Sequence, residues 1–301
     1  YNANMLANEM FLDRADLRAS VVSKAKQVGY TPTSSTSADA VVDVVVNDAT
    51  GSSLTMTRGT KFTTTVNGIS YSFVNNSELS ITPLDGVYKF SNVTLNEGTL
   101  LNFKYTANSS DTDQRFIIPN NNVDTTTLTV KVQESSSDAT TNTYTLATGI
   151  TALDSTSKVY FLQEVENGRY EIYFGDGVLG KSIADGNIII MDYIVCNRGA
   201  PNGATTFTLS GTLGGFSDAT VTTISNATNG SGPESIESIK YNAPRDYTSQ
   251  DRAVTADDYK VLVKSLYANA QSVQVYGGED AATPDYGKVY ISIKAKSGSN
   301  L

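Results

Sequence analysis

A two-residue hydrophobic period, running from about residue 40 to residue 230, limits the fold of this chain more than any other pattern in it. The runs Lys61–Val66 and Ile69–Val74 alternate in this way and flank Asn67-Gly68. Asn and Gly tolerate the positive φ angles of a type I′ turn, so the stretch predicts a β-hairpin. Further strands are expected at Ala40–Val46, Val87–Val93, Leu100–Tyr105, Thr125–Val132, Lys158–Val165, Arg169–Phe174 and Asn187–Cys196.

The two ends of the chain follow a helical period instead. Within Leu6–Val28 apolar residues recur at three- and four-residue steps, and Gly29 followed by Pro32 predicts where this helix ends. Thr255 is expected to cap a second helix, with carboxylates in its first turn. The apolar stripe of that helix consists of Tyr259, Leu262, Val263 and Leu266, and strands are expected after it at Ser272–Tyr276 and Lys288–Lys296.

Together these patterns predict a mostly β, multidomain fold with an N-terminal helix and a small C-terminal α/β piece of the order α-β-β. The expected domains are a helical segment at 1–32, a β-domain formed by 33–84 and 151–232, a β-domain inserted at 85–150, and an α/β domain at 233–301. The last of these is expected to be truncated, because its second strand lies close to the end of the sequence.

Composition removes several classes of function. The 301 residues include no His and one Cys, Cys196, so the chain by itself forms no Ser-His-Asp or Cys-His nucleophile, no His metal site, no Cys zinc cluster and no internal disulfide. The 22 Lys and Arg against 31 Asp and Glu give a net charge of −9, the opposite of a nucleic-acid binder. No apolar run approaches the roughly 18 residues of a membrane span. We therefore expect no catalytic residues, metal, cofactor, nucleic acid or membrane span.

Some acidic and basic groups still merit a chemical interpretation. The pairs Glu164 with Glu166, and Glu234 with Glu237, supply the two carboxylates of a glycosidase, although surface solvation or capping is the simpler expectation. Cys196 closes an apolar strand and is expected to be a small core residue. A modest basic cluster of Lys240, Arg245 and Arg252 is expected to pair with Asp246 and Asp251 rather than to bind phosphate.

Four stretches, in order along the chain, carry a family resemblance. They are Leu17–Pro32, Arg58–Phe62, the region 168–203 with its Phe174-Gly175-Asp176-Gly177 motif, and Gly230–Tyr259. In this combination the chain resembles the baseplate-J-like proteins of contractile phage tails, and among them the T-even-type baseplate wedge subunits of the inner ring. The shared signature residues, Gly175, Asp176, Gly177, Gly180, Gly186, Gly199 and Gly203, are interpreted as turn formers.

The resemblance implies a structural function without catalytic residues. Such a subunit self-associates as a homodimer and joins neighbouring wedges into an inner baseplate ring, which reorganises when the tail contracts. Its implied partners are other baseplate wedge proteins and hub-proximal proteins. Its implied location is the tail baseplate of the virion, after assembly in the host cytoplasm.

The expected contact surfaces are amphipathic helices near the two ends of the chain. The candidate interface residues are Met10, Phe11, Leu17 and Val21 in the first helix, and Tyr259, Leu262, Val263 and Leu266 in the second. Packing of both helices on the chain's own sheets is the competing interpretation. Two other functions stay open, namely a receptor- or glycan-binding tail module with an exposed Tyr cluster, and a cell-wall-degrading enzyme that uses two carboxylates.

Overall fold

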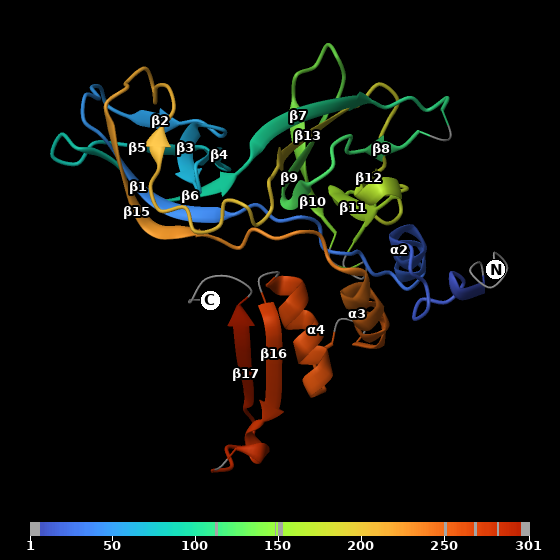
Figure 1. Ribbon diagram of the computed structural model, residues 1–301. Coiled ribbons are helices and arrows are strands. Elements are labelled where there is room, and N and C mark those ends of the chain that lie inside the picture. Colours follow the sequence, from blue (N-terminus) through green and yellow to red (C-terminus); the bar gives the residue numbers. More distant parts are fainter. Residues whose placement is uncertain are drawn as a thin grey trace. The chain divides into compact units, whose positions relative to one another are not determined.

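The computed structural model describes residues 7–111, 114–147, 149, 153–249, 252–267, 270–281 and 283–295 (Figure 1). The chain divides into two compact units. Unit 1 is formed by Tyr1–Ser34, Gln163–Tyr170 and Pro233–Leu301, and unit 2 by Ser35–Leu162 and Glu171–Gly232. Every described α-helix lies in unit 1, whereas most strands lie in unit 2. The expected class, mostly β with an N-terminal helix and a C-terminal α-β-β piece, is confirmed.

The first sheet of unit 2 has the strand order β14-β3-β4-β6-β1-β15. These strands are β14 (Thr208–Leu209), β3 (Lys61–Val66), β4 (Ile69–Asn75), β6 (Tyr88–Glu97), β1 (Asp39–Val46) and β15 (Ala219–Thr228), and a small ribbon pairs β2 (Leu54–Met56) with β5 (Leu79–Ile81). Asn67 and Gly68 have φ angles of 50° and 79°, which confirms the expected β3–β4 hairpin.

The core of this sheet follows from the period of two. In β1, Val42 and Val44 are fully buried, and the residues that alternate with them, such as Asp43, are half-buried. Phe62, Phe73 and Phe90 from neighbouring strands pack into the same cluster. The Val-rich strand is an interior strand of the sheet, with β6 on one side and the edge strand β15 on the other.

The second sheet has the order β7-β13-β9-β10-β11-β12-β8. Its strands are β7 (Thr99–Thr106), β13 (Ile188–Val195), β9 (Val123–Gln133), β10 (Thr141–Leu146), β11 (Val159–Glu164), β12 (Tyr170–Phe174) and β8 (Phe116–Ile117). The pairs of β13 with β7 and with β9 are antiparallel, whereas β10 and β11 are parallel.

Strand pairing does not follow the boundary expected at residue 85. β6 lies within 85–150 and pairs with β1 and β4 of the first sheet, while β7 and β9 pair with β13 of the second. A hydrophobic period gives the positions of strands but not their partners, so a sequence-based division of strands between domains stays a prediction.

A buried carboxylate lies where β6 ends. Glu97 is fully buried, and its two carboxylate oxygens accept hydrogen bonds from the backbone N–H of Asn197 (2.8 Å) and from the Asn197 side-chain amide (2.6 Å). Burial raises the pKa of Glu97, against the effect of these two hydrogen bonds. No Lys or Arg in the described ranges forms an ion pair with it.

Unit 1 contains three described α-helices and a two-stranded sheet. These are α2 (Arg18–Gln27), α3 (Ile236–Ser249), α4 (Ala256–Leu266), β16 (Ala270–Gly277) and β17 (Val289–Ala295), with short 3₁₀ turns η1 (Glu166–Gly168) and η2 (Gly278–Asp280). α3 packs against both α2 and α4, and α4 packs on β16. The predicted α-β-β order of the C-terminal piece and the Thr255 cap are confirmed, since Thr255 and Asp258 form a capping box.

The helix expected over Leu6–Val28 is interrupted. Ala7 and Asn8 are helical, residues 9–17 are not, and α2 starts at Arg18; Leu6, the expected start, lies outside the described residues. The Glu9 carboxylate accepts hydrogen bonds from the backbone N–H groups of Asp16 (2.9 Å) and Leu17 (3.3 Å), which holds the ends of this non-helical segment together. Gly29 ends the helix as expected, with a φ of 82°. In the described part of the chain no helix is both long and apolar enough to cross a membrane.

Candidate functional site

The Phe-Gly-Asp-Gly motif forms a tight turn after β12. A Cβ on Gly175 would lie 2.4 Å from the carbonyl carbon and oxygen of Gly180, so no larger residue fits there. Gly177 and Gly180 have φ angles of 89° and 91°. The Asp176 carboxylate accepts hydrogen bonds from the backbone N–H groups of Val178 (2.9 Å) and Leu179 (3.0 Å). These bonds lower the pKa of Asp176, whose side chain is used to close the turn.

The other signature glycines also lie in turns. Gly186 and Gly203 have φ angles of 78° and 88°, and a Cβ on Gly199 would approach the carbonyl oxygen of Gly230 to 3.0 Å. In this geometry these signature residues form turns, as the sequence pattern predicts.

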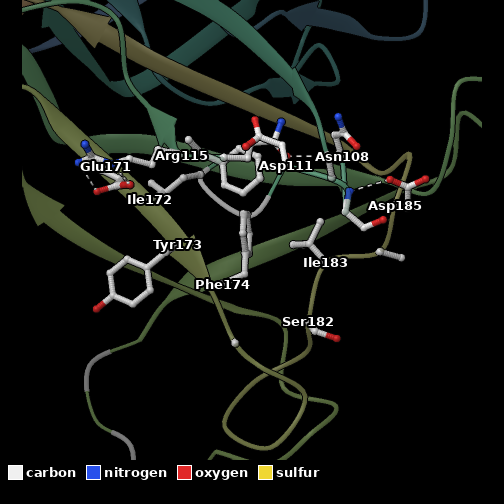
Figure 2. A pocket seen from close by; sticks show the side chains of 16 residues that line it. Asn108, Asp111, Arg115, Glu171, Ile172, Tyr173, Phe174, Ser182, Ile183 and Asp185 are labelled. Carbon is white, nitrogen blue, oxygen red and sulfur yellow. Dashed lines mark hydrogen bonds and ion pairs between the residues drawn. The ribbon is translucent and has the colours of Figure 1, made fainter.

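Beside the motif lies a pocket of about 290 Å³ in unit 2. Figure 2 shows its wall, which is built by the ends of β8 and β12 and by the segment 182–185. Glu171, the buried carboxylate of this wall, is held by Arg115 through two hydrogen bonds of 2.8 and 2.9 Å. On the opposite side the Asp185 carboxylate accepts from the backbone N–H of Ser109 (2.8 Å). The buried carboxylate of this pocket is therefore already paired.

Aromatic rings form the base of this pocket. Phe174 makes edge-to-face contacts with Phe116 (5.7 Å between centroids) and with Tyr144 (5.4 Å). Tyr173, the preceding residue of the strand, points away from Phe174 (Figure 2) and stacks on Phe161 at 5.1 Å. Tyr173 is 44% exposed, so this stacked pair presents an aromatic ring to solvent.

The candidate interface residues near the N-terminus do not share one environment. Met10, Phe11 and Leu17 are exposed by 67%, 58% and 51%, whereas Val21 is fully buried. Val21 packs in a core with Ile239 and other apolar residues of α2 and α3, so it is not available to a partner in this structure. The competing interpretation, packing on the chain's own elements, therefore describes Val21, although the partner element is a helix rather than a sheet.

The candidates near the C-terminus divide similarly. Tyr259, Leu262 and Val263 are half-buried in α4, which packs on α3 and β16. Leu266, the last residue of α4, is 86% exposed. Taken together, the exposed members of the two candidate sets are Met10, Phe11, Leu17 and Leu266.

The expectation that Glu164 is solvated is wrong. Its side chain is 1% exposed and accepts from the Arg18 guanidinium at Nε (2.7 Å) and Nη2 (2.8 Å), while Glu166 lies exposed in the following turn. Burial acts to lower the pKa of Arg18, but the hydrogen bond and the charge of Glu164 outweigh it, so the pKa is raised. The third guanidinium nitrogen donates to the backbone carbonyl of Glu234.

Glu234 accepts hydrogen bonds from several parts of unit 1. Its carboxylate accepts from the Tyr30 hydroxyl (2.8 and 2.9 Å), the Ser238 hydroxyl (2.6 Å) and the Asn242 amide (2.9 Å). Burial first, and then the charge of Glu234, raise the pKa of Tyr30. We refer to Arg18, Tyr30, Glu164, Glu234 and Asn242 as the polar clasp. Sequence reasoning missed it because its members come from three distant segments.

Comparison with known proteins points to one class. Two family models match the chain: bacteriophage baseplate wedge protein gp6, third domain, over residues 102–202, and baseplate structural protein gp6, C-terminal domain I, over residues 255–301. Both models describe structural proteins of a phage baseplate, and they support the same class for this chain. Neither description carries the baseplate-J-like name, so that finer resemblance stays a prediction.

A relative among curated proteins agrees with the family models. The chain is 28% identical to the baseplate wedge protein gp6 of Enterobacteria phage T4 over 326 aligned residues, which cover 99% of the chain and 47% of that protein. The chain therefore spans about half the length of this relative. A cryo-EM structure of the anti-feeding prophage baseplate matches 84% of the chain and 47% of its own, at 12% identity and a TM-score of 0.30, a likeness that carries no argument.

Proposed function

We propose that the chain is a structural, non-enzymatic component of a baseplate wedge in a contractile phage tail, located in the virion after assembly in the host cytoplasm. The observation that carries this proposal is the match to a baseplate wedge protein along 99% of the chain, together with two family models of the same kind. The turn-forming role of the signature residues supports it, because a subunit of this kind needs a rigid scaffold rather than titrating groups.

The finer part of the proposal concerns assembly. The chain self-associates as a homodimer, joins neighbouring wedges into the inner ring as a baseplate-J-like subunit does, and contacts other wedge and hub-proximal proteins. The exposed apolar residues Met10, Phe11, Leu17 and Leu266 of unit 1 are the proposed contact points, since burial of large exposed apolar side chains favours association.

Light scattering behind a sizing column, over a concentration series, tests the assembly proposal. The wild-type chain is expected to reach twice its 32.1 kDa mass. Phe11→Asp and Leu266→Asp should each shift the dimer toward the monomer without loss of secondary structure. Leu84→Asp, at a 77% exposed position of unit 2, is the matched control. A wild-type chain that stays monomeric at the highest concentration, or a dimer that is insensitive to both substitutions, would contradict these contacts.

A second candidate, a glycan-binding tail module, is favoured by one observation. Tyr173 lines the pocket of Figure 2 and presents a stacked aromatic face, a common platform for sugar rings. Titration of the chain with host-surface oligosaccharides, followed by nuclear magnetic resonance, tests it. Loss of the response in Tyr173→Ala would support glycan binding, and an absence of any response in the wild type would end this alternative.

A further inference from the structure

Unit 1 contains a concave surface that the proposed function does not use. It lies between α3, α4 and β16, has a volume of about 240 Å³, and we refer to it as the α3–α4 pocket. Pockets that hold cofactors or drug-sized ligands usually measure roughly 300–1,000 Å³, so this one suits a side chain or two rather than a small molecule.

Positive charge is concentrated in this pocket. Its lining carries three cations, Arg245, Lys260 and Lys264, and one carboxylate, Asp257. The Lys260 Nζ lies 2.9 Å from the Asp257 carboxylate, and this pairing leaves Arg245 and Lys264 in excess. Within the described ranges neither of these two residues forms an ion pair with a carboxylate. This local excess of positive charge contrasts with the net charge of −9 of the whole chain.

The structure bears on only part of the basic cluster expected from the sequence, and the expected pairing with Asp246 and Asp251 stays a prediction. Lys240 pairs with Glu237 on the same helix (3.2 Å), and Arg245 stacks on an aromatic ring. Asp251, one of the expected partners, lies outside the described residues. The cationic surface therefore forms around Arg245 together with Lys260 and Lys264 of α4, which the pattern of α3 alone could not reveal.

The aromatic ring of Tyr241 lies under both excess cations, Arg245 and Lys264. The Arg245 Cζ lies 3.6 Å from the centroid of the Tyr241 ring, and the Lys264 Nζ lies 5.5 Å from it. Arg245 also donates one hydrogen bond, from Nη1 to the Tyr241 carbonyl (2.7 Å). A guanidinium has five N–H donors in a planar fork, so most of them remain for a further acceptor while the group is already positioned.

We propose that the α3–α4 pocket binds an acidic side chain on an extended segment of a partner protein, with its carboxylate held between Arg245 and Lys264. The two oxygens of a carboxylate match the planar fork of the Arg245 guanidinium, and the volume of the pocket suits one such side chain. This inference rests on the proposed function in one respect, which is that the chain binds another protein.

The segment has room to continue past the pocket. Arg245 and Asp257 also line a neighbouring hollow of about 530 Å³, whose wall includes Arg252 and Thr255. The bound acidic residue would thus occupy the α3–α4 pocket, and the next residues of the partner would lie along the groove between α3 and the start of α4.

Fluorescence anisotropy of a labelled hexaglutamate peptide, added to the full chain at low salt, tests the proposal. Hexaglutamate should bind saturably and hexaglutamine should not. The double substitution Arg245→Gln with Lys264→Gln should weaken binding about tenfold, because two solvent-accessible ion pairs are lost. The matched control is Lys104→Gln with Lys131→Gln, which removes the same charge from β7 and β9 and should leave affinity within about twofold.

Several outcomes would overturn the assignment. Equal binding of hexaglutamate to the double variant and to the control would place the peptide elsewhere, and displacement by inorganic phosphate at equal concentration would make the pocket a general anion site. If the double variant fails to fold, Lys264→Gln alone and its charge-keeping partner Lys264→Arg answer the question, since Arg should restore binding. The dimer measured by light scattering is a separate readout, so the two proposals can fail independently.

Discussion

The two units hold a buried glutamate in different ways. In unit 1 Glu164 lies against the Arg18 guanidinium, with two hydrogen bonds of 2.7 and 2.8 Å. In unit 2 Glu97 is fully buried and accepts from Asn197, a neutral residue, through both the backbone N–H and the side-chain amide. A cation supplies an opposite charge to Glu164, whereas Glu97 is held only by the dipoles of a neutral residue; unit 2 also holds Glu171 by a cation, Arg115.

The two arrangements predict different effects of mutation and of pH on stability. A buried ion pair is sensitive to the loss of either partner, because the remaining charge is left without compensation. A carboxylate held by neutral donors has its pKa raised by burial, as Glu97 does, so its contribution to stability varies with pH. The Glu164 site should therefore be the more sensitive to mutation, and the Glu97 site should respond to pH.

The largest effect is expected from Glu164→Ala. The substitution leaves the partly buried Arg18 without its carboxylate, and we expect the free energy of unfolding of unit 1 to fall by about 2–3 kcal/mol. Because every described α-helix lies in unit 1, the helical circular dichroism signal during urea denaturation measures this loss. Glu166→Ala, two residues away and exposed, is the matched control and should change stability by less than about 0.5 kcal/mol. Equal effects of the two variants would mean that the ion pair does not hold unit 1 together.

A smaller effect is expected from Asn197→Ala in unit 2. One Glu97 oxygen loses its side-chain donor but the backbone donor remains, so the free energy of unfolding should decrease by about 1–2 kcal/mol. Urea denaturation followed through the β-sheet signal provides the measurement. Asn121→Ala, at an exposed position before β9, should stay within about 0.5 kcal/mol of the wild type. A neutral result at Asn197 would show that solvent reaches Glu97.

The smallest effect is expected from Glu97→Gln, and it is a change in how the free energy of unfolding varies with pH. Because the folded-state pKa is raised, the stability linked to Glu97 is fully present below its unfolded-state pKa of about 4.3 and is lost as pH rises through the folded-state value. The Gln variant does not titrate, so its free energy of unfolding minus that of the wild type should increase from about pH 4 upward. Denaturation at several pH values tests this trend, with exposed Glu78→Gln as the control. A constant difference would contradict the comparison.

Local rules were sufficient for much of the fold. The Asn67-Gly68 hairpin and the Thr255 capping box were both predictable, because a turn dipeptide or a cap acts within a few residues. α3 was harder to predict, since Pro244 interrupts its pattern and its buried residues include the polar Asn242.

The site depended on contacts that no local pattern contains. Glu164 was expected to be solvated because it precedes a tight turn, yet the residue that buries it, Arg18, lies 146 positions earlier. Val21 and Phe11 both belong to the apolar pattern of the sequence. Val21 is a core residue because α3 packs over it, whereas Phe11 is exposed. A local sequence pattern does not show which residues a distant element will bury.

The polar clasp also affects the order in which parts of the chain can fold during synthesis on the ribosome. Arg18 and Tyr30 find their partner Glu234 at separations of 216 and 204 residues. At a synthesis rate of roughly 5–20 residues per second, α2 waits about 10–40 s before α3 emerges to cover Val21 and Ala25. During that interval unit 2 can complete its sheets, while the apolar face of α2 is open to chaperones or to other nascent chains.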